Sequence, residues 1–151
     1  MKLLTDELWA QLPTLYAQEN EKDPIIHVKF FTPSWTDWTW FLTEESQAQE
    51  DDDFICFGCV IGLEGEWGYF SLREIESVRG PAGLTIERDL YFTPRRKSEI
   101  PDFQIVEQIN RGQERFPTLS FYDKRKVDFG LFLGRFWVEI LGHNLGTEVP
   151  K

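Results

Sequence analysis

Two cysteines three residues apart, Cys56 and Cys59, form the most chemically suggestive motif in the chain. A Cys-x-x-Cys motif supports redox chemistry when it lies at a helix N-terminus, where the thiolate is stabilised. Here it lies in the apolar run FICFGCVIGL, which is typical of a strand, and residues three apart on a strand face opposite sides. A zinc site would need further ligands, and neither a second such motif nor a histidine is near in sequence. The pattern therefore predicts two packed, reduced thiols.

The most acidic stretch runs from Glu44 to Asp53 and reads EESQAQEDDD, with six acids in ten residues. Three interpretations are open: a solvated loop between strands, a contact surface for a basic partner, or a divalent-metal site built from carboxylate oxygens. The run lacks the spacing of an EF-hand loop, which disfavours the metal site. As candidate partner-binding residues we take Trp35 and the six acids Glu44, Glu45, Glu50, Asp51, Asp52 and Asp53.

Nothing else in the sequence specifies catalysis. His27 lies in the middle of an apolar run, which favours a cross-strand contact, and His143 has no nucleophile signature beside it. The segment Gly80 to Gly83 lacks the Lys-Ser/Thr ending of a phosphate loop. We therefore predict no catalytic residue, no bound metal and no cofactor.

Charge is distributed unevenly over the 151 residues, whose formal net charge is −10. Residues 1–94 hold 18 acids and 6 bases, whereas residues 95–151 hold 8 acids and 10 bases. An acidic surface repels nucleic-acid phosphates, so direct nucleic-acid binding through residues 1–94 is unfavourable. The opening segment lacks a continuous apolar stretch, and no run of about 20 apolar residues could span a membrane. We expect a cytoplasmic protein that does not bind membranes.

A central hairpin followed by a short helix organises the predicted fold. Apolar runs at 54–63 and 67–70 flank Glu64-Gly65-Glu66, which indicates two strands joined by a turn. Ser71 then caps a helix, with Glu74 completing a capping box, and Gly80-Pro81 ends it.

Further elements are predicted before the hairpin. Apolar residues between Leu4 and Tyr16 recur at helical spacing, with Thr5 as N-cap, and Pro13 predicts either a kink or two short helices. Residues 25–31 and 37–43 read as strands, and both faces of the second strand carry apolar bulk, which indicates a central strand or a binding face. Trp35 lies in the turn between them, where it either folds over a sheet edge or is exposed for recognition.

Beyond the hairpin and its helix, residues 84–92 could supply one more strand. After a basic cluster at 95–97 we predict a helix from 103 to 112, a strand at 118–122, an exposed turn at 123–126, and a helix or strand–helix mixture at 127–141. The expected fold is a single α+β domain with a mainly antiparallel sheet, an N-terminal helix and a short helix after the hairpin. Residues 1–94 form its core, and residues 95–151 are a C-terminal extension packed on it.

Several strings in residues 1–94 resemble the domain-of-unknown-function 2958 family of small bacterial proteins. These are MKLLTDELWAQLPTLYAQE at the start, HVKFFTP at 27–33, WTWF at 38–41 and the stretch from FGCVIGLEGEW to ERDLYF at 57–92. The resemblance implies a gene carried on plasmids and integrative elements, often near antirestriction or conjugation genes. It implies no enzyme activity, because the family has no assigned catalytic residues.

Our leading hypothesis is a non-catalytic acidic protein of a mobile element that binds the basic surface of a host protein. It would inhibit a host defence or DNA-processing protein, as antirestriction or anti-CRISPR proteins do, with its carboxylates imitating DNA phosphates as one route. One alternative is a metal-dependent enzyme or accessory factor that uses the same acids. Another is a single-strand DNA accessory protein that uses C-terminal bases and aromatic residues: Arg95, Arg96, Lys97, Lys124, Arg125, Lys126, Phe121, Tyr122 and Trp137.

Overall fold

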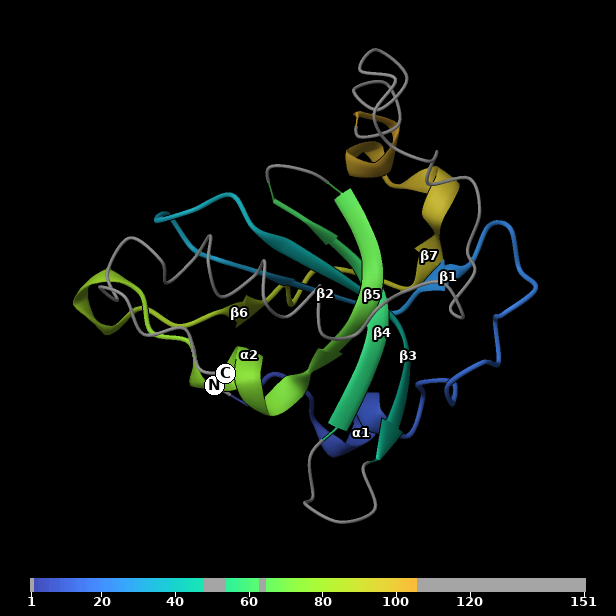
Figure 1. The fold of residues 1–151 in the computed structure, drawn as a ribbon, viewed down its shortest axis with the longest axis horizontal. Helices are drawn as coiled ribbons and strands as arrows, with labels where there is room; N and C mark the ends of the chain where they lie inside the picture. Colours follow the sequence, from blue (N-terminus) through green and yellow to red (C-terminus); the bar gives the residue numbers. More distant parts are fainter. Residues whose placement is uncertain (1, 48–53, 63–64, 106–151) are drawn as a thin grey trace, which may run out of the picture.

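A computed structural model describes residues 2–47, 54–62 and 65–105 of the chain. Figure 1 shows a twisted antiparallel sheet with short helices at its ends. In chain order the elements are α1 (Asp6–Trp9), β1 (Ile25–Ile26), β2 (Val28–Phe31), β3 (Thr39–Gln47), β4 (Phe54–Ile61), β5 (Gly65–Ser71), α2 (Leu72–Ser77), the 3-10 helix η1 (Pro81–Gly83), β6 (Glu87–Arg88), β7 (Arg95–Arg96) and the 3-10 helix η2 (Lys97–Glu99).

Within the described residues the main sheet has five strands in the order β5-β4-β3-β2-β6, and every pairing among them is antiparallel. β3 is therefore central, as its apolar bulk on both faces predicts. A second, two-stranded sheet pairs β1 with β7 through Ile25 opposite Arg96. The prediction of one α+β domain with a mainly antiparallel sheet is confirmed.

The alternation along β3 divides the core between the two faces of the sheet. Trp40 and Leu42 lie in one cluster, together with residues of α2 and of the N-terminal segment. Phe41 lies in the other cluster, with Ile100 and Phe103 packed over it. Because side chains alternate along a strand, successive residues of β3 fill both clusters.

A bulge after Leu42 shifts the register between β3 and β4. Leu42 pairs with Gly58, whereas Glu44 pairs with Phe57, so Thr43 is the extra residue. Thr43 Oγ1 donates a hydrogen bond to the Phe57 carbonyl oxygen at 2.8 Å. A Cβ at position 58 would collide with the Phe41 carbonyl oxygen, so glycine lets the strands approach here.

Helix α2 forms where it was predicted, with Ser71 as its N-cap. Ser71 has an extended backbone, and its Oγ accepts a hydrogen bond from the Glu74 amide at 3.2 Å, as an N-cap does. Leu72 and Ile75 are buried against the sheet, and the helix ends before Val78.

The N-terminal helix is shorter than predicted. Thr5 caps α1, but the helix ends at Trp9, where a helix reaching Tyr16 was expected. Pro13 and Leu15 instead hydrogen-bond to the backbone of Glu45 in β3, at 3.0 Å each. The prediction of a helix as far as Tyr16 was wrong, because proline cannot donate a hydrogen bond within a helix and β3 offers backbone partners to this segment.

Two further predictions are modified. The strand expected over 84–92 is reduced to β6, which pairs with β2 at the sheet edge. Residues 101–105 are helical, and Ile100 and Phe103 are buried on the sheet, so residues 95–105 pack on the core. The elements predicted at 118–122, 123–126 and 127–141, and most of the helix at 103–112, lie outside the described residues.

Candidate functional site

Glu44 lies in β3 and is fully buried, with 0% of its surface exposed. Its Oε2 accepts a hydrogen bond from the Tyr16 amide at 2.7 Å, and its Oε1 accepts one from the Gln18 amide at 2.7 Å. The expectation of a solvated loop beginning at Glu44 was wrong, because the strand continues and two backbone amides compensate for burying the charge. Glu44 thus holds the loop before β1 in place.

Glu45 follows on the opposite face of β3 and is 8% exposed. Its Oε2 has no hydrogen-bond partner in the described part of the chain, and burial raises the pKa of this carboxyl group. Adjacent acids on opposite faces cannot hold one metal ion together. Within residues 2–47, 54–62 and 65–105 no cluster of three potential metal ligands occurs. The other four candidate acids, at positions 50 to 53, lie outside the described residues.

Trp35 is partly buried and packs against the cluster that contains Trp40. Its ring lies over Gly80, where an added Cβ would be 2.5 Å from the indole. The turn that carries Trp35 is held by Thr32, whose Oγ1 accepts a hydrogen bond from the Trp38 amide at 3.1 Å and donates one to the Thr36 carbonyl oxygen at 2.8 Å. Of the two interpretations of Trp35, packing over the sheet agrees with these contacts.

Both cysteines are free and buried, and they lie in different core clusters on opposite faces of β4. Burial raises the pKa of the Cys59 thiol well above its ordinary value. This geometry matches the predicted packed thiols, since two thiols on opposite faces cannot form a disulfide with each other. His27 lies between β1 and β2, where its amide donates a hydrogen bond to the Leu42 carbonyl oxygen at 2.8 Å and burial lowers the pKa of its ring.

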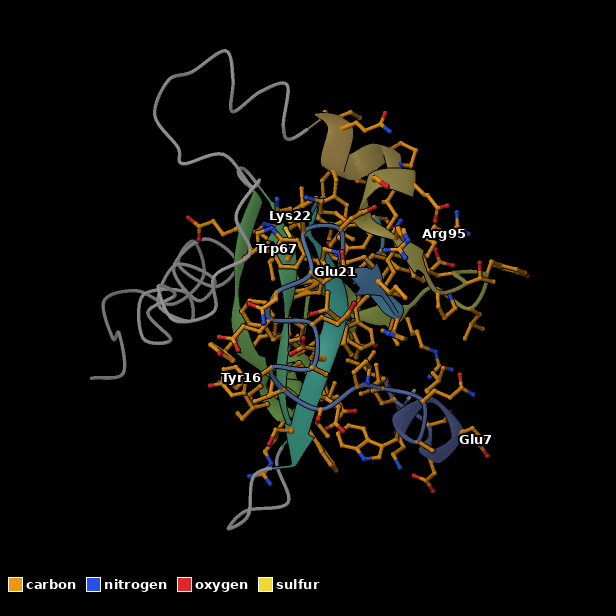
Figure 2. The ribbon with its side chains drawn as sticks, turned by 90° about the vertical axis from the view of Figure 1, so that its right-hand side faces the viewer. Glu7, Tyr16, Glu21, Lys22, Trp67 and Arg95 are labelled. Carbon is orange, nitrogen blue, oxygen red and sulfur yellow. The ribbon has the colours of Figure 1, made fainter. Side chains whose placement is uncertain are left out.

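The first basic cluster is engaged by its own chain. Arg96 Nη1 donates a hydrogen bond to the Asp23 carbonyl oxygen, Lys97 is buried, and the Arg95 guanidinium lies over the Phe92 ring at 5.4 Å. Figure 2 shows Arg95 well separated from Tyr16 and Trp67, so these aromatic residues do not line one surface with it. The other residues proposed for single-strand DNA binding lie outside the described residues.

A groove of about 540 Å³ lies at the edge of the sheet where β2 and β6 pair. One wall comes from the turn between β2 and β3, and the other from β6 and the residues that follow it. The lining combines aromatic, apolar and charged side chains: Lys29, Phe31, Thr32, Thr36, Asp37, Trp38, Thr39, Glu87, Arg88, Asp89, Leu90 and Tyr91.

Two large apolar side chains project beside this groove. Leu90 is 64% exposed and Tyr91 is 93% exposed. We call this pair the tip. The tip is part of a defined turn, because the Tyr91 amide donates to Asp89 Oδ1 at 3.0 Å and the Asp89 amide donates to the Lys29 carbonyl oxygen at 2.9 Å. Tyrosine is enriched at protein interfaces, so the tip is a candidate contact surface of this fold.

Sequence reasoning missed the tip because residues 84–92 were taken as a strand, in which Leu90 or Tyr91 would be covered. The signal that could have revealed it is Asp89. An aspartate whose side chain accepts from the amide two residues later forms a turn, which directs the next residues away from the sheet.

A family model described as a protein of unknown function (DUF2958) matches residues 3–101. The chain belongs to the DUF2958 family. The match covers the groove and the tip, and confirms the family resemblance of the N-terminal part. No curated protein and no solved structure matched the chain. In the part of this DUF2958 protein that the structure describes, no helix is long and apolar enough to cross a membrane.

Proposed function

We propose that this protein is a non-catalytic binding protein that acts by covering a surface of another protein. In the setting that the family resemblance implies, the partner is a host defence or DNA-processing protein, and binding inhibits it. The observation that carries the proposal is the tip, where Leu90 and Tyr91 are 64% and 93% exposed beside a groove. Tyrosine is enriched among the residues that dominate binding energy at protein interfaces.

The other candidate groups of the chain support binding over catalysis. The Glu44 carboxylate is occupied by the amides of Tyr16 and Gln18, and the thiols of Cys56 and Cys59 are buried on opposite faces. The two described acids of the acidic run are not available to imitate DNA phosphates. Glu44 and Glu45 face the interior, so the described acids available to a partner are those on other elements.

A capture experiment tests the proposal. Tagged full-length protein, wild type or with Leu90→Ser and Tyr91→Ser together, is mixed with host-cell extract, and the retained proteins are identified by mass spectrometry. Each candidate partner is then purified and its dissociation constant is measured by calorimetry. We expect one stoichiometric partner whose affinity falls at least about tenfold for the double variant, because truncating a residue that dominates an interface typically costs about 2 kcal/mol or more.

Leu84→Ser is the matched control, since Leu84 is also an exposed large apolar residue but does not line the groove. The control should bind the partner as wild type does, and the melting temperature of each variant is measured to verify that it remains folded. A stoichiometric partner that binds the tip variant as tightly as wild type would contradict the proposed surface. The absence of any stoichiometric partner would contradict the binding function.

A further inference from the structure

We infer that the groove beside the tip takes an arginine-bearing segment of the partner, with the guanidinium directed at Asp37 and Glu87. The inference rests on the proposed binding function and adds the chemistry of the bound segment. It is carried by the charges in the groove wall, by how the chain already uses them, and by the aromatic surface around them.

The acids of the groove are available to a ligand. Asp37 is exposed and Glu87 is half-buried. Within the described ranges, neither carboxylate takes part in a hydrogen bond or an ion pair. Asp89 is the third acid in the lining, and one of its oxygens already accepts from the Tyr91 amide.

The two basic side chains of the groove already interact with other groups of this protein. Arg88 Nη1 donates a hydrogen bond to the Leu3 carbonyl oxygen at 2.8 Å, which draws this guanidinium towards the N-terminal segment. Lys29 Nζ lies 4.0 Å from Asp102 Oδ2 and 5.7 Å from the centre of the Phe41 ring. The groove therefore offers a ligand more negative than positive charge, and a cation complements it.

The backbone that carries the acids is fixed before any ligand arrives. Asp37 lies within the turn closed by Thr32, whose amide donates to the Trp38 carbonyl oxygen at 3.0 Å. Glu87 pairs with Phe31 across β2 and β6. A preformed site loses less conformational entropy when it binds, so these carboxylates favour association more than acids on a free loop would.

The aromatic lining favours arginine over lysine. Phe31, Trp38 and Tyr91 border the same groove as the acids. A planar guanidinium stacks on aromatic rings, loses hydration more readily than an ammonium, and binds a carboxylate through two parallel hydrogen bonds. Leu90 at the tip offers an apolar contact to a neighbouring side chain of the same segment. A volume of about 540 Å³ is in the range of ligand sites and exceeds what one side chain needs.

The inference is tested with three fluorescent peptides. They share the same apolar residues and carry arginine, lysine or glutamate at the charged positions. Binding to full-length protein is measured by fluorescence anisotropy, and the contact site by chemical-shift changes in isotope-labelled protein. We expect the arginine peptide to bind most tightly, the lysine peptide at least threefold more weakly, and the glutamate peptide not at all. The shifts should centre on Asp37, Glu87 and Tyr91, and affinity should fall as salt rises.

The decisive variant is Asp37→Asn with Glu87→Gln, which should weaken the arginine peptide at least tenfold. Its control is Glu7→Gln with Glu21→Gln, which removes the same charge at exposed positions outside the groove lining (Figure 2). A further variant, Asp37→Lys with Glu87→Lys, should reverse the preference towards the glutamate peptide. Equal weakening by the groove variant and its control, or no binding of the arginine peptide, would overturn the inference.

The proposed function is judged separately, by the tip variant and the purified partner. If the tip variant loses the partner while Asp37→Asn with Glu87→Gln retains it, the binding function stands and the arginine inference fails. If neither variant changes partner binding, the proposed surface and the arginine inference both fail, although the partner still demonstrates a binding function.

Discussion

The Tyr16 amide donates a hydrogen bond to Oε2 of the buried Glu44 carboxylate at 2.7 Å. Tyr16 has a positive φ of 72°, which a bulky residue rarely adopts and which costs free energy. The same carboxylate binds the Gln18 amide, and the Gln18 side chain in turn accepts a hydrogen bond from the Ile25 amide at 2.7 Å. One buried charge thus connects the loop before β1 with the centre of the sheet.

Replacing Glu44 with glutamine should destabilise the fold strongly. An amide group has only one acceptor oxygen, so one of the two backbone amides would face an NH₂ donor. Hydrogen bonds to charged groups are worth about 1.5–3 kcal/mol each, and we expect the free energy of unfolding to fall by about that amount. Urea unfolding followed by tryptophan fluorescence measures the change. Glu7→Gln is the control, and an equal effect of the two substitutions would show that Glu44 does not hold the loop.

Glu45 should make the protein less stable as the pH rises from acid to neutral. Burial raises the pKa of this carboxyl group from its ordinary value of 4.5, so the unfolded chain releases the proton first. The contribution of Glu45 to the free energy of unfolding is therefore greatest below pH 4.5. It is lost as the pH rises through the higher pKa of the folded state. Glu45→Gln should remove that loss. The measurement is the difference in unfolding free energy between wild type and variant from pH 4 to pH 7. A difference that does not change over this range would contradict the prediction.

Trp35 and Gly80 should be energetically coupled. Gly80→Ala would place a Cβ 2.5 Å from the indole, so the ring must move and the variant should be destabilised. In a Trp35→Leu background the same substitution should cost less, because the smaller side chain leaves room. A double-mutant cycle from urea unfolding should give a coupling of about 0.5–3 kcal/mol, the range for residues in contact. Strictly additive effects would indicate that Trp35 leaves Gly80 free in solution.

The thiols of Cys56 and Cys59 should be unreactive in the folded protein. Both side chains are buried, and burial raises the pKa of the Cys59 thiol, which suppresses the nucleophilic thiolate. Ellman's reagent should modify neither thiol in native buffer and both in strong denaturant. Rapid reaction of the native protein would contradict the packing described here.

Local patterns predicted the elements whose partners lie nearby in sequence. The alternation of Trp40 and Phe41 is readable from the side-chain period of a strand, and the cap of α2 from Ser71 and Glu74. Glu44 could not be predicted in this way, because its partners are backbone amides 26 and 28 residues earlier in the chain. The composition reveals the negative charge of Glu44 but not the loop whose backbone amides donate hydrogen bonds to it.

The groove illustrates the same limit at longer range. Asp37 and Glu87 are 50 positions apart, and they share one groove because β6 pairs with β2 and the Thr32 turn lies beside that pair. No local pattern indicates this pairing, since β6 has only two residues and its flanking sequence resembles a longer strand. The acids that seemed most suggestive, Glu44 and Glu45, are instead interior residues of β3.

The pairing of Ile25 with Arg96 has a consequence for how the protein is made. These partners are 71 positions apart, and Phe103, which covers Phe41, follows later still. At about 5–20 residues per second, a ribosome needs roughly 4–14 s to synthesise the chain between them. During that interval one face of the nascent sheet lacks its cover, and its aromatic residues are exposed to other chains. Chaperones that bind apolar segments should therefore engage this protein chiefly from the emergence of residue 41 until residue 103 has emerged.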